Sequence, residues 1–500
     1  MTCQLLTQNP NQQKGGNMKQ LITTPAYSLK DFRLLPGFTF ESCSIDKVSL
    51  KTRLCCKGGG FIFIQLPFIS AAMQAVTGIE MCRALAELGG IGVLPVMDSI
   101  DTQCEKVNAV KRYKAGFQTN IITFSPSHLL AEVKSTMEKT SYSIFPVTDS
   151  GFFHGKLLGI ITDKDYDPRY DLELNVNERM KKDVQVGIEV DDLKEANHLM
   201  IQYGHGFLPI VTREGTLQAV VFKKDLDKHI KHPNASVDVY KRLCVGAAVS
   251  THPEDRQRIK ELVENEVDFL VIDASDGYTQ YQEQALKWIK ERFDTPVIGG
   301  NVITGEAADM LLVSGADGIK VGMGIGSGCI TQQVKATGRG QATALMDVVK
   351  VRDEFAKENR YVPVIADGGI TTPLDVAVAL ALGADSVMMG NFFARFSESP
   401  GVIHNINGQQ MKSYWMEAST RAKNNRRYLM GSGAFFEEGI EGFVPHLGSI
   451  YNVLPVSVRQ LQSTLSTVGA ATIEDFHEKA VLELQSPLSQ QDSQVHSMIT

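Results

Sequence analysis

Residues 267–275 read VDFLVIDAS, an apolar run that ends in an aspartate and a serine. The run does not alternate polar and apolar residues, which is typical of a strand buried on both faces of a parallel sheet. Similar runs occur at 61–70, 89–95, 243–249, 295–302, 315–324, 362–369 and 383–390, with helical patterns between them. Eight such strands predict an α/β fold, a (β/α)8 TIM barrel; an open doubly wound sheet is the alternative.

The spacing of these runs breaks once, between the second and the third. The stretch between them is too long for one crossover, and it contains an internal repeat in which 143–166 resembles 206–227. Each copy has an apolar strand with a proline, a polar turn, a second strand and an aspartate. We predict a paired domain over 117–235, inserted between barrel parts 26–116 and 236–485. Polar tails are expected at 1–25 and 486–500, the second of them mobile.

Composition and charge restrict the class of protein. Lys and Arg number 50 against 57 Asp and Glu, a formal net charge of −7, which excludes a broad nucleic-acid-binding surface. The eight cysteines have no metal-binding spacing and the start has no hydrophobic signal core, so we expect reduced thiols in a cytoplasmic protein. The most apolar stretch, 60–73, is too short to span a membrane.

Polar residues follow several of the predicted strands. Barrel active sites lie at the carboxyl ends of the strands, where Asp273, Ser275, Asn301 and Asp367 are found. Any one aspartate there is equally well explained as a helix N-cap, but several at one rim favour a ligand site. Glycines after the sixth and eighth strands let backbone N–H groups approach an anion. These positions predict a mononucleotide phosphate site, with Asp367 placed for the ribose.

Cys329 lies in GIGSGCITQQVKATGRGQ (324–341), directly after the sixth strand. Nearby cations or a helix N-terminus turn a thiol into a nucleophile, and the polar residues that follow suggest a short helix. The alternative, an inert apolar residue, suits Cys82 and Cys244 better, because those lie inside apolar runs. The basic stretch 411–445 has no helix or strand period and is interpreted as a mobile flap or a solvated loop.

These motifs resemble a known family. GSGCITQQVKATGRGQATA (326–344) resembles the catalytic loop of the IMP dehydrogenase family, and its later motifs follow in order as ADGGI, MKSYW, RRY and EEGIEGFVP. The repeat resembles a tandem CBS domain, a common sensor of adenine or guanine nucleotides. Its ribose-holding hydroxyl and carboxylate are kept as Thr162 and Asp165; the second copy has Phe222 before Asp225. A structural insert that binds no nucleotide is the alternative.

The resemblance implies a reaction in guanine nucleotide synthesis, the NAD-dependent oxidation of IMP to XMP. The Cys329 thiolate adds to C2 of the purine, a hydride passes to NAD+, and water hydrolyses the covalent thioimidate. Arg427 on the flap is the implied base, with Tyr428 beside it and Thr331 in a proton relay.

The family's binding residues correspond to positions of this chain. Those implied for IMP are Met73, Asn301, Ser327, Asp367, Gly368, Gly369, Gly390, Asn391, Tyr414, Trp415, Met416, Glu417, Ala418 and Glu438. Those implied for NAD+ are His252, Asp273, Ala274, Ser275, Tyr281, Gly322, Met323 and Gly324. Carbonyl groups of Gly322, Gly324 and Cys329 are implied to bind K+, and the family forms homotetramers.

The chain departs from the family pattern near the thiol. Gly328 replaces the usual isoleucine before the cysteine, and Met416 and Ala418 replace glycines of the turn that contacts the base. We expect a more mobile loop and a more crowded purine site. The residues at 492–494 replace a Glu-Gly-Gly that serves the potassium site. Two other functions fit the motifs less well, GMP reductase with NADPH and a non-catalytic nucleotide-sensing scaffold.

Overall fold

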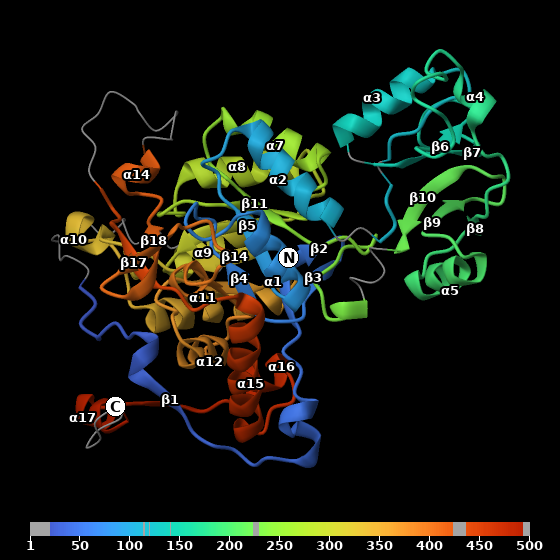
Figure 1. Cartoon of the computed structure of the whole chain (residues 1–500). Helices are drawn as coiled ribbons and strands as arrows, with labels where there is room; N and C mark the ends of the chain where they lie inside the picture. Colours follow the sequence, from blue (N-terminus) through green and yellow to red (C-terminus); the bar gives the residue numbers. More distant parts are fainter. Residues whose placement is uncertain are drawn as a thin grey trace.

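The computed structural model describes residues 21–113, 116–119, 121–140, 142–223, 230–423 and 437–493 of the 500-residue chain. Eight parallel strands form a closed barrel, as the apolar runs predict (Figure 1). In barrel order the strands are β4 (Phe68–Ser70), β5 (Ile91–Leu94), β11 (Gly246–Val249), β12 (Phe269–Ile272), β13 (Val297–Val302), β14 (Gly318–Val321), β15 (Val364–Asp367) and β16 (Ser386–Met389).

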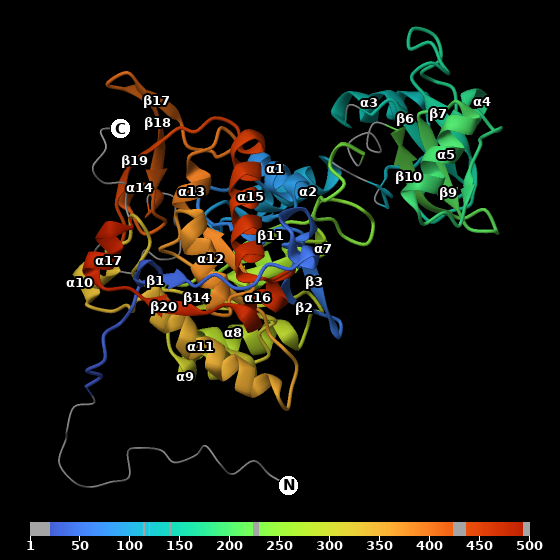
Figure 2. The ribbon, with the colours of Figure 1, turned by 90° about the horizontal axis from the view of Figure 1, so that it is seen from below.

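Helices cover the outside of this barrel in Figures 1 and 2. Their sequences explain their ends: Thr304 and Thr372 cap the helices that follow them by accepting backbone N–H bonds, and Gly89 ends a helix with a left-handed conformation. The helices are α1 (Ile79–Leu88), α2 (Ile100–Tyr113), α7 (Asp255–Glu264), α8 (Gln280–Lys290), α9 (Gly305–Val313), α11 (Gln341–Ala356), α12 (Pro373–Ala381), α15 (Ile450–Val468) and α16 (Ile473–Lys479).

The sequence pattern predicted one barrel strand over 61–70, and the structure shows that this prediction is wrong. Its first half belongs to β3 (Gly60–Ile64), which pairs antiparallel with β2 (Thr52–Lys57) in a hairpin outside the barrel. Pro67, which has no N–H group to donate, separates this hairpin from β4. Positive φ angles at Gly58 and Gly59 form the hairpin turn.

The inserted region contains two similar units. Each contains a helix and an antiparallel strand pair: α3 (Leu130–Thr140) with β6 (Ile144–Thr148) and β7 (Leu157–Thr162), then α5 (Leu193–Tyr203) with β9 (Phe207–Val211) and β10 (Leu217–Phe222). Short elements α4 (Val176–Arg179) and β8 (Gly187–Ile188) lie between them. A hydrophobic cluster joins β9 and β10 to Ile144, Leu157 and Ile160, so the two units share a core that is separate from the core of the barrel.

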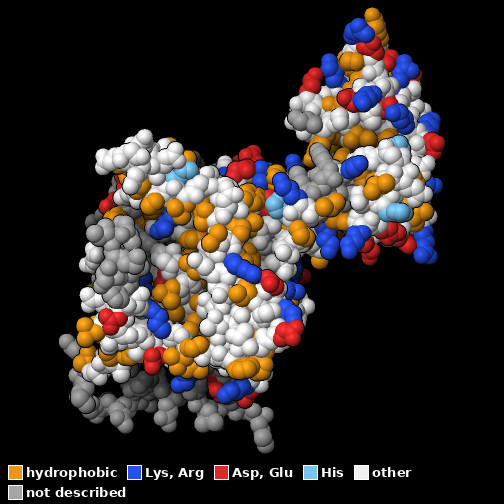
Figure 3. Space-filling view, turned by 60° about the horizontal axis from the view of Figure 1, so that its bottom comes forward, with side chains coloured by type: hydrophobic (Ala, Val, Ile, Leu, Met, Phe, Trp, Pro, Cys, Tyr) orange, Lys and Arg blue, Asp and Glu red, His pale blue; other side chains and the backbone are white. Residues whose placement is uncertain are grey.

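The inserted region projects from one side of the barrel in both ribbon views. The chain enters and leaves it at adjacent points, because Phe117 N donates to Tyr240 O at 3.0 Å. Charged side chains of both signs are interspersed on the face of this region seen in Figure 3, without a single-sign patch. No helix in the described ranges is both long and apolar enough to cross a bilayer.

The sequence predicted no regular structure in 411–445, but both ends of this stretch are strands. Its ends form β18 (Gln409–Trp415) and β19 (Glu441–Pro445), which pair antiparallel, and β17 (Ile403–Ile406) completes a small sheet. Asn407 and Gly408, both with positive φ, connect β17 to β18. Asn-Gly is the preferred sequence of such a two-residue hairpin turn, so the sequence did contain the signal.

The terminal segments pack against each other. β1 (Phe32–Leu34) pairs with β20 (Leu482–Leu484), and α17 (Pro487–Asp492) lies within the stretch predicted as a tail. Ser486 caps this helix and Gln490 donates to Asp31 at 3.0 Å, which attaches it to the N-terminal segment.

Candidate active site

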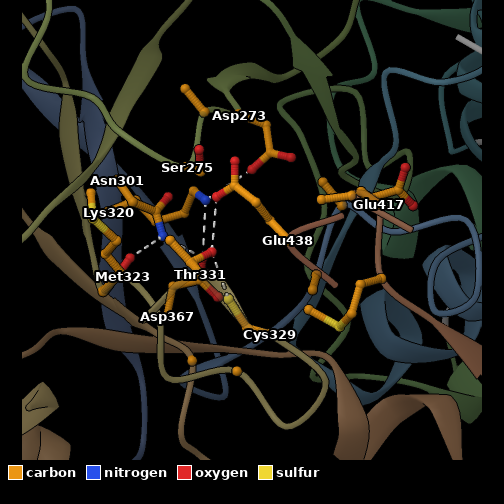
Figure 4. Close-up of a pocket in the computed structure, with 18 of the residues that line it drawn as sticks. Asp273, Ser275, Asn301, Lys320, Met323, Cys329, Thr331, Asp367, Glu417 and Glu438 are labelled. Atoms are coloured by element: carbon orange, nitrogen blue, oxygen red, sulfur yellow. Dashed lines mark hydrogen bonds and ion pairs between the residues drawn. The ribbon is translucent and has the colours of Figure 1, made fainter. Parts of the chain in front are cut away.

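A cavity of about 550 Å³ opens at the carboxyl ends of the barrel strands (Figure 4). Its size suits a nucleotide with part of a second ligand. Most of the predicted site residues line it: Met73, His252, Asp273, Ala274, Ser275, Asn301, Gly322, Met323, Gly324, Cys329, Thr331, Asp367, Gly368, Met416, Glu417, Ala418 and Glu438. Lining residues that the sequence did not single out are Ala71, Ala72, Ser250, Thr251, Lys320, Ile325, Gly326 and Met388.

Cys329 differs from the other described cysteines. Cys43, Cys55, Cys56, Cys82, Cys104 and Cys244 are buried, whereas Cys329 is partly exposed in the cavity. Burial raises the pKa of the Cys82 thiol to about 12 and that of Cys104 to about 11, so both remain protonated. Among the described cysteines, Cys329 is therefore the candidate nucleophile.

A chain of polar contacts leads from this thiol to a carboxylate. Cys329 Sγ lies 3.1 Å from Thr331 Oγ1, at the start of α10 (Thr331–Lys335). The Thr331 hydroxyl donates to Glu438 Oε2 at 3.0 Å, and Lys335 Nζ lies 3.5 Å from Glu438 Oε1. Since the hydroxyl donates to the carboxylate, it is free to accept a proton from the thiol. The contacts thus form a route for a proton from sulfur to Glu438.

Backbone hydrogen bonds hold Glu438 next to the cysteine loop. Ile330 N donates to Glu438 O at 2.9 Å, and Ile440 N donates to Gly328 O at 3.0 Å, so Cys329 faces Gly439 in an isolated β-bridge. These segments are more than a hundred positions apart in sequence. We call Cys329, Thr331, Met416 and Glu438 the thiol side of the cavity.

Gly328 and Met416, two positions at which the chain departs from the family pattern, lie next to each other at this bridge. An ideal Cβ on Gly328 would lie 3.0 Å from both Cγ and Sδ of Met416, and one on Gly439 would lie 2.3 Å from Met416 Cβ. The methionine side chain therefore fills space that two glycines leave open. It also lines the cavity, as does Ala418.

The opposite wall is built from strand ends. Lys320 on β14 is 2% exposed, and its Nζ lies 2.9 Å from Asp273 Oδ1 and 3.0 Å from Asp367 Oδ2. Asn301 Nδ2 donates to Asp367 Oδ2 at 2.9 Å and to Gly322 O at 2.7 Å. We call Asp273, Asn301, Lys320 and Asp367 the carboxylate floor. The sequence held a signal for Lys320, a charged residue inside the apolar strand GIKV (318–321).

Burial and charge act oppositely on Lys320. Burial lowers the pKa of its ammonium group, but Asp273 and Asp367 outweigh burial and raise the pKa above the usual value. The lysine therefore stays charged at neutral pH. Asn301 Oδ1 is buried and has no hydrogen-bond partner within the described part of the chain, so it can accept from a ligand.

Several residues predicted for the phosphate end lie together beside the cavity. A Cβ on Gly390 would lie 3.0 Å from Tyr414 Oη and 3.1 Å from Met73 Sδ. Burial raises the pKa of Tyr414, and Asp367 and Cys329 raise it further. Gly368 and Gly369 have positive φ and lie against Ile325.

The other predicted residues that the structure describes are not part of the cavity lining. Ser327 is exposed, and Asn391 Oδ1 accepts from Arg395 Nη2 at 2.6 Å. Trp415 lines a second cavity of about 310 Å³, where Arg421 lies over its ring at 3.9 Å. Tyr281 is 63% exposed on α8, outside the lining of the main cavity. Arg427 and Tyr428 lie outside the described residues.

Two of the three predicted potassium carbonyls accept hydrogen bonds from side chains. Gly322 O accepts from Asn301 Nδ2, and Gly324 O accepts from Gln332 Nε2 at 2.9 Å. A carbonyl oxygen has two lone pairs, so each keeps capacity for a cation. In the described ranges, no group of three or more His, Cys, Asp or Glu side chains forms a metal site.

A closed parallel barrel with a partly exposed cysteine and a nucleotide-sized cavity at its strand ends defines a (β/α)8-barrel enzyme. A family model described as the IMP dehydrogenase / GMP reductase domain matches residues 26–496. The chain belongs to the IMP dehydrogenase / GMP reductase family.

Individual relatives agree with this membership. The chain is 38% identical to the inosine-5′-monophosphate dehydrogenase of Tritrichomonas foetus, over 96% of this chain and 98% of the relative. It is 34% identical to the enzyme of that name from Toxoplasma gondii, over 95% and 96%. Among solved structures, a GMP reductase variant from Trypanosoma brucei in complex with guanosine 5′-monophosphate has a TM-score of 0.80 at 29% identity, over 95% of this chain and 98% of that chain.

Proposed function

We propose that this chain is an IMP dehydrogenase, which oxidises IMP to XMP with NAD+ in guanine nucleotide synthesis. The observation that carries the proposal is the contact chain from Cys329 through Thr331 to Glu438, at the edge of a nucleotide-sized cavity. A thiol, a proton path and a binding cavity together suit covalent catalysis on a purine ring.

In the first step the Cys329 thiolate forms a bond to C2 of the hypoxanthine ring. The thiol proton leaves through the Thr331 hydroxyl toward Glu438, along contacts of 3.1 and 3.0 Å. NAD+, when bound, accepts the hydride that leaves C2. The product of this step is a thioimidate, in which the purine is covalently attached to Cys329.

In the second step water adds to C2 of the thioimidate and the C–S bond breaks. XMP is released and the thiolate is restored. From the family resemblance we propose Arg427 as the base and Tyr428 as its neighbour on a flap within 411–445. The sheet formed by β17 to β19 gives that flap fixed ends.

The carboxylate floor would bind the ribose groups of both ligands, and the glycine-rich strand ends would bind the phosphate of IMP. Asp367 would accept from the ribose of IMP, and Asp273 from the nicotinamide ribose of NAD+. Gly369, Gly390 and the loop at Ser327 would provide backbone N–H groups for the phosphate. Both aspartate side chains are partly exposed, at 20% and 27%, which leaves them accessible to hydroxyl donors.

We also propose a potassium ion on the carbonyl groups of Gly322, Gly324 and Cys329. A cation there would fix the backbone around the thiol. Initial rates in K+, compared with Na+ at equal ionic strength, test this assignment; equal rates in the two salts contradict it.

The inserted region and the assembly complete the proposal. The pair of units is proposed to be a CBS pair that binds an adenine or guanine nucleotide in its first copy. There Thr162 Oγ1 lies 2.7 Å from Asp165 Oδ2. The enzyme is proposed to be a cytoplasmic homotetramer. Calorimetric titration with ATP and GTP, and light scattering of the purified protein, test the two statements.

A direct assay separates this function from the alternative that the GMP reductase neighbour supports. We expect IMP with NAD+ to give an increase in absorbance at 340 nm, and GMP with NADPH to give no change. Oxidation of NADPH by GMP without turnover of IMP would identify a GMP reductase. Absence of both reactions, with IMP still bound, would favour a non-catalytic scaffold.

A further inference from the structure

The carboxylate floor contains one ammonium group between two carboxylates. Lys320 Nζ contacts one oxygen of each, Oδ1 of Asp273 and Oδ2 of Asp367 (Figure 4). Those two oxygens therefore lie close together, because both contact the same nitrogen. Without the ammonium, two negative charges at this separation would repel each other.

The second oxygen of each carboxylate remains available. Within the described part of the chain, no protein group donates to Asp273 Oδ2 or Asp367 Oδ1, and both side chains reach the cavity. Lys320 itself is 2% exposed and lines the cavity together with the two aspartates. Each carboxylate thus presents one acceptor to the cavity while the other is held.

We infer that Lys320 is a positioning residue that sets the preference for ribose over 2′-deoxyribose at both nucleotide subsites. This inference rests on the proposed function, because it takes Asp367 and Asp273 as the ribose acceptors of IMP and NAD+. A hydroxyl that donates to a carboxylate forms a strong, directional bond only where the carboxylate is fixed. Lys320 contacts both carboxylates, whereas Asn301 Nδ2 contacts Asp367 alone, at 2.9 Å.

Lys320→Met removes the charge and both contacts at nearly constant volume. The two aspartates would then repel each other without the ammonium between them. Asp273 would lose the contact to its held oxygen, and Asp367 would keep only the one from Asn301. The affinity for the ribose form should fall toward that for the 2′-deoxy form. A general loss of structure would instead weaken both forms alike, so the ratio of the two affinities isolates the positioning role.

The same chain offers a matched control. Lys111 is also buried and also bridges two aspartates, with Nζ 3.1 Å from Asp238 Oδ2 and 2.6 Å from Asp268 Oδ2. Asp268 lies immediately before β12, whereas Asp273 follows it, so this second bridge is at the opposite end of the strand. Lys111→Met removes an equivalent buried bridge away from the cavity.

The experiment measures dissociation constants of IMP and 2′-deoxy-IMP by calorimetry without dinucleotide, on the full chain. We expect the wild type and Lys111→Met to prefer IMP by about tenfold or more, the value for a hydrogen bond to a charged group. Lys320→Met should reduce this preference to about threefold or less, and Lys320→Arg should restore most of it. On the cofactor side, the ratio of kcat/KM for NAD+ to kcat/KM for its analogue without the 2′-hydroxyl on the nicotinamide ribose should fall in the same variants.

An unchanged preference in Lys320→Met overturns the inference, and so does a change at only one of the two subsites. Equal loss of preference in Lys111→Met overturns it as well, since that would reflect general destabilisation. If Lys320→Met does not fold, as judged by circular dichroism, Lys320→Gln replaces it, with the same outcomes. A wild-type protein that does not bind IMP would instead contradict the proposed function, so the two failures are distinguishable.

Discussion

The two sides of the cavity are held in different ways. The carboxylate floor comes from consecutive barrel strands, β12 to β15, and is joined by an almost completely buried ammonium group. The thiol side comes from loops distant in sequence, joined by one isolated β-bridge and by a methionine packed against glycines. Barrel closure therefore fixes the floor, whereas the thiol side depends on how loops pack.

The largest expected effect comes from removing the sulfur. Cys329→Ala should reduce turnover of IMP by at least about 10³-fold, because no other group on the thiol side can form the covalent bond. The affinity for IMP should remain within a few-fold, since the floor is untouched. Steady-state rates and calorimetry measure the two quantities. Cys104→Ala, a buried thiol away from the cavity, is the control; turnover by Cys329→Ala at the wild-type rate would refute the assignment.

The next effect concerns the proton path. Thr331→Val keeps the shape of the side chain but removes the hydroxyl between Cys329 and Glu438, so kcat should fall about 10²-fold. Stopped-flow kinetics of NADH formation would locate the slowed step. Thr343→Val, which removes a hydroxyl that accepts from Tyr27 N outside the cavity, serves as control. An unchanged kcat in Thr331→Val would exclude the relay.

A smaller effect tests the packing of the thiol side. Gly328→Ile should crowd Met416, whose Sδ would lie 3.0 Å from the new Cβ, and overpacking typically costs about 1–3 kcal/mol. We expect about a tenfold loss in kcat. Met416→Gly in the same chain should recover much of it, and the double-mutant cycle gives the coupling. Additive effects of the two substitutions would mean that the side chains do not interact.

The smallest effect compares two buried lysines. Lys412 on β18 donates to the carbonyl groups of Phe396 at 2.6 Å and Ser399 at 2.7 Å, and burial lowers its pKa to about 8, partly opposed by Glu398. The unfolded chain keeps this proton up to about pH 10.4. Between these values the unfolded state binds more protons, so Lys412 should increase the free energy of unfolding as pH rises, by about 1–3 kcal/mol in all.

Denaturant unfolding of wild type and Lys412→Met from pH 7 to 10 measures this contribution. The difference between the two proteins should change in favour of the wild type as pH rises through 8. Lys320, whose carboxylates keep it charged, should show no such change over this range. A difference that is independent of pH would contradict the lowered pKa of Lys412.

The sequence predicts the floor better than the thiol side, for a physical reason. Strand ends of a barrel meet at one face, so Asp273, Asn301 and Asp367 could be grouped from their positions after apolar runs. Cys329 was equally recognisable from its glycine-rich surroundings. The bridge from Cys329 to Gly439 and the packing of Gly328 against Met416 could not be predicted, because local patterns carry no information on which distant loops make contact.

Two errors had signals in the sequence. The strand assigned to 61–70 ignored Pro67, which separates a hairpin from the barrel strand. The irregular stretch from 411 began just after Asn407–Gly408, a hairpin turn that places the next residues in a strand. Trp415 was assigned to the substrate by motif, but on this strand it lies in a second cavity.

The adjacent entry and exit of the inserted region have a consequence for how the chain can be rearranged. Because Phe117 and Tyr240 are hydrogen-bonded neighbours, the insert leaves the barrel and returns to it at adjacent points. Its length therefore has little effect on the entropy of closing the chain at that point. The insert has hydrophobic clusters of its own, so removing it uncovers little of the barrel core. The segment 235–240 that leads back to the barrel must stay, because Ser236 Oγ donates to Gly89 O and Asp238 accepts from Lys111. With that segment kept, another domain with neighbouring termini should be accepted in place of the insert.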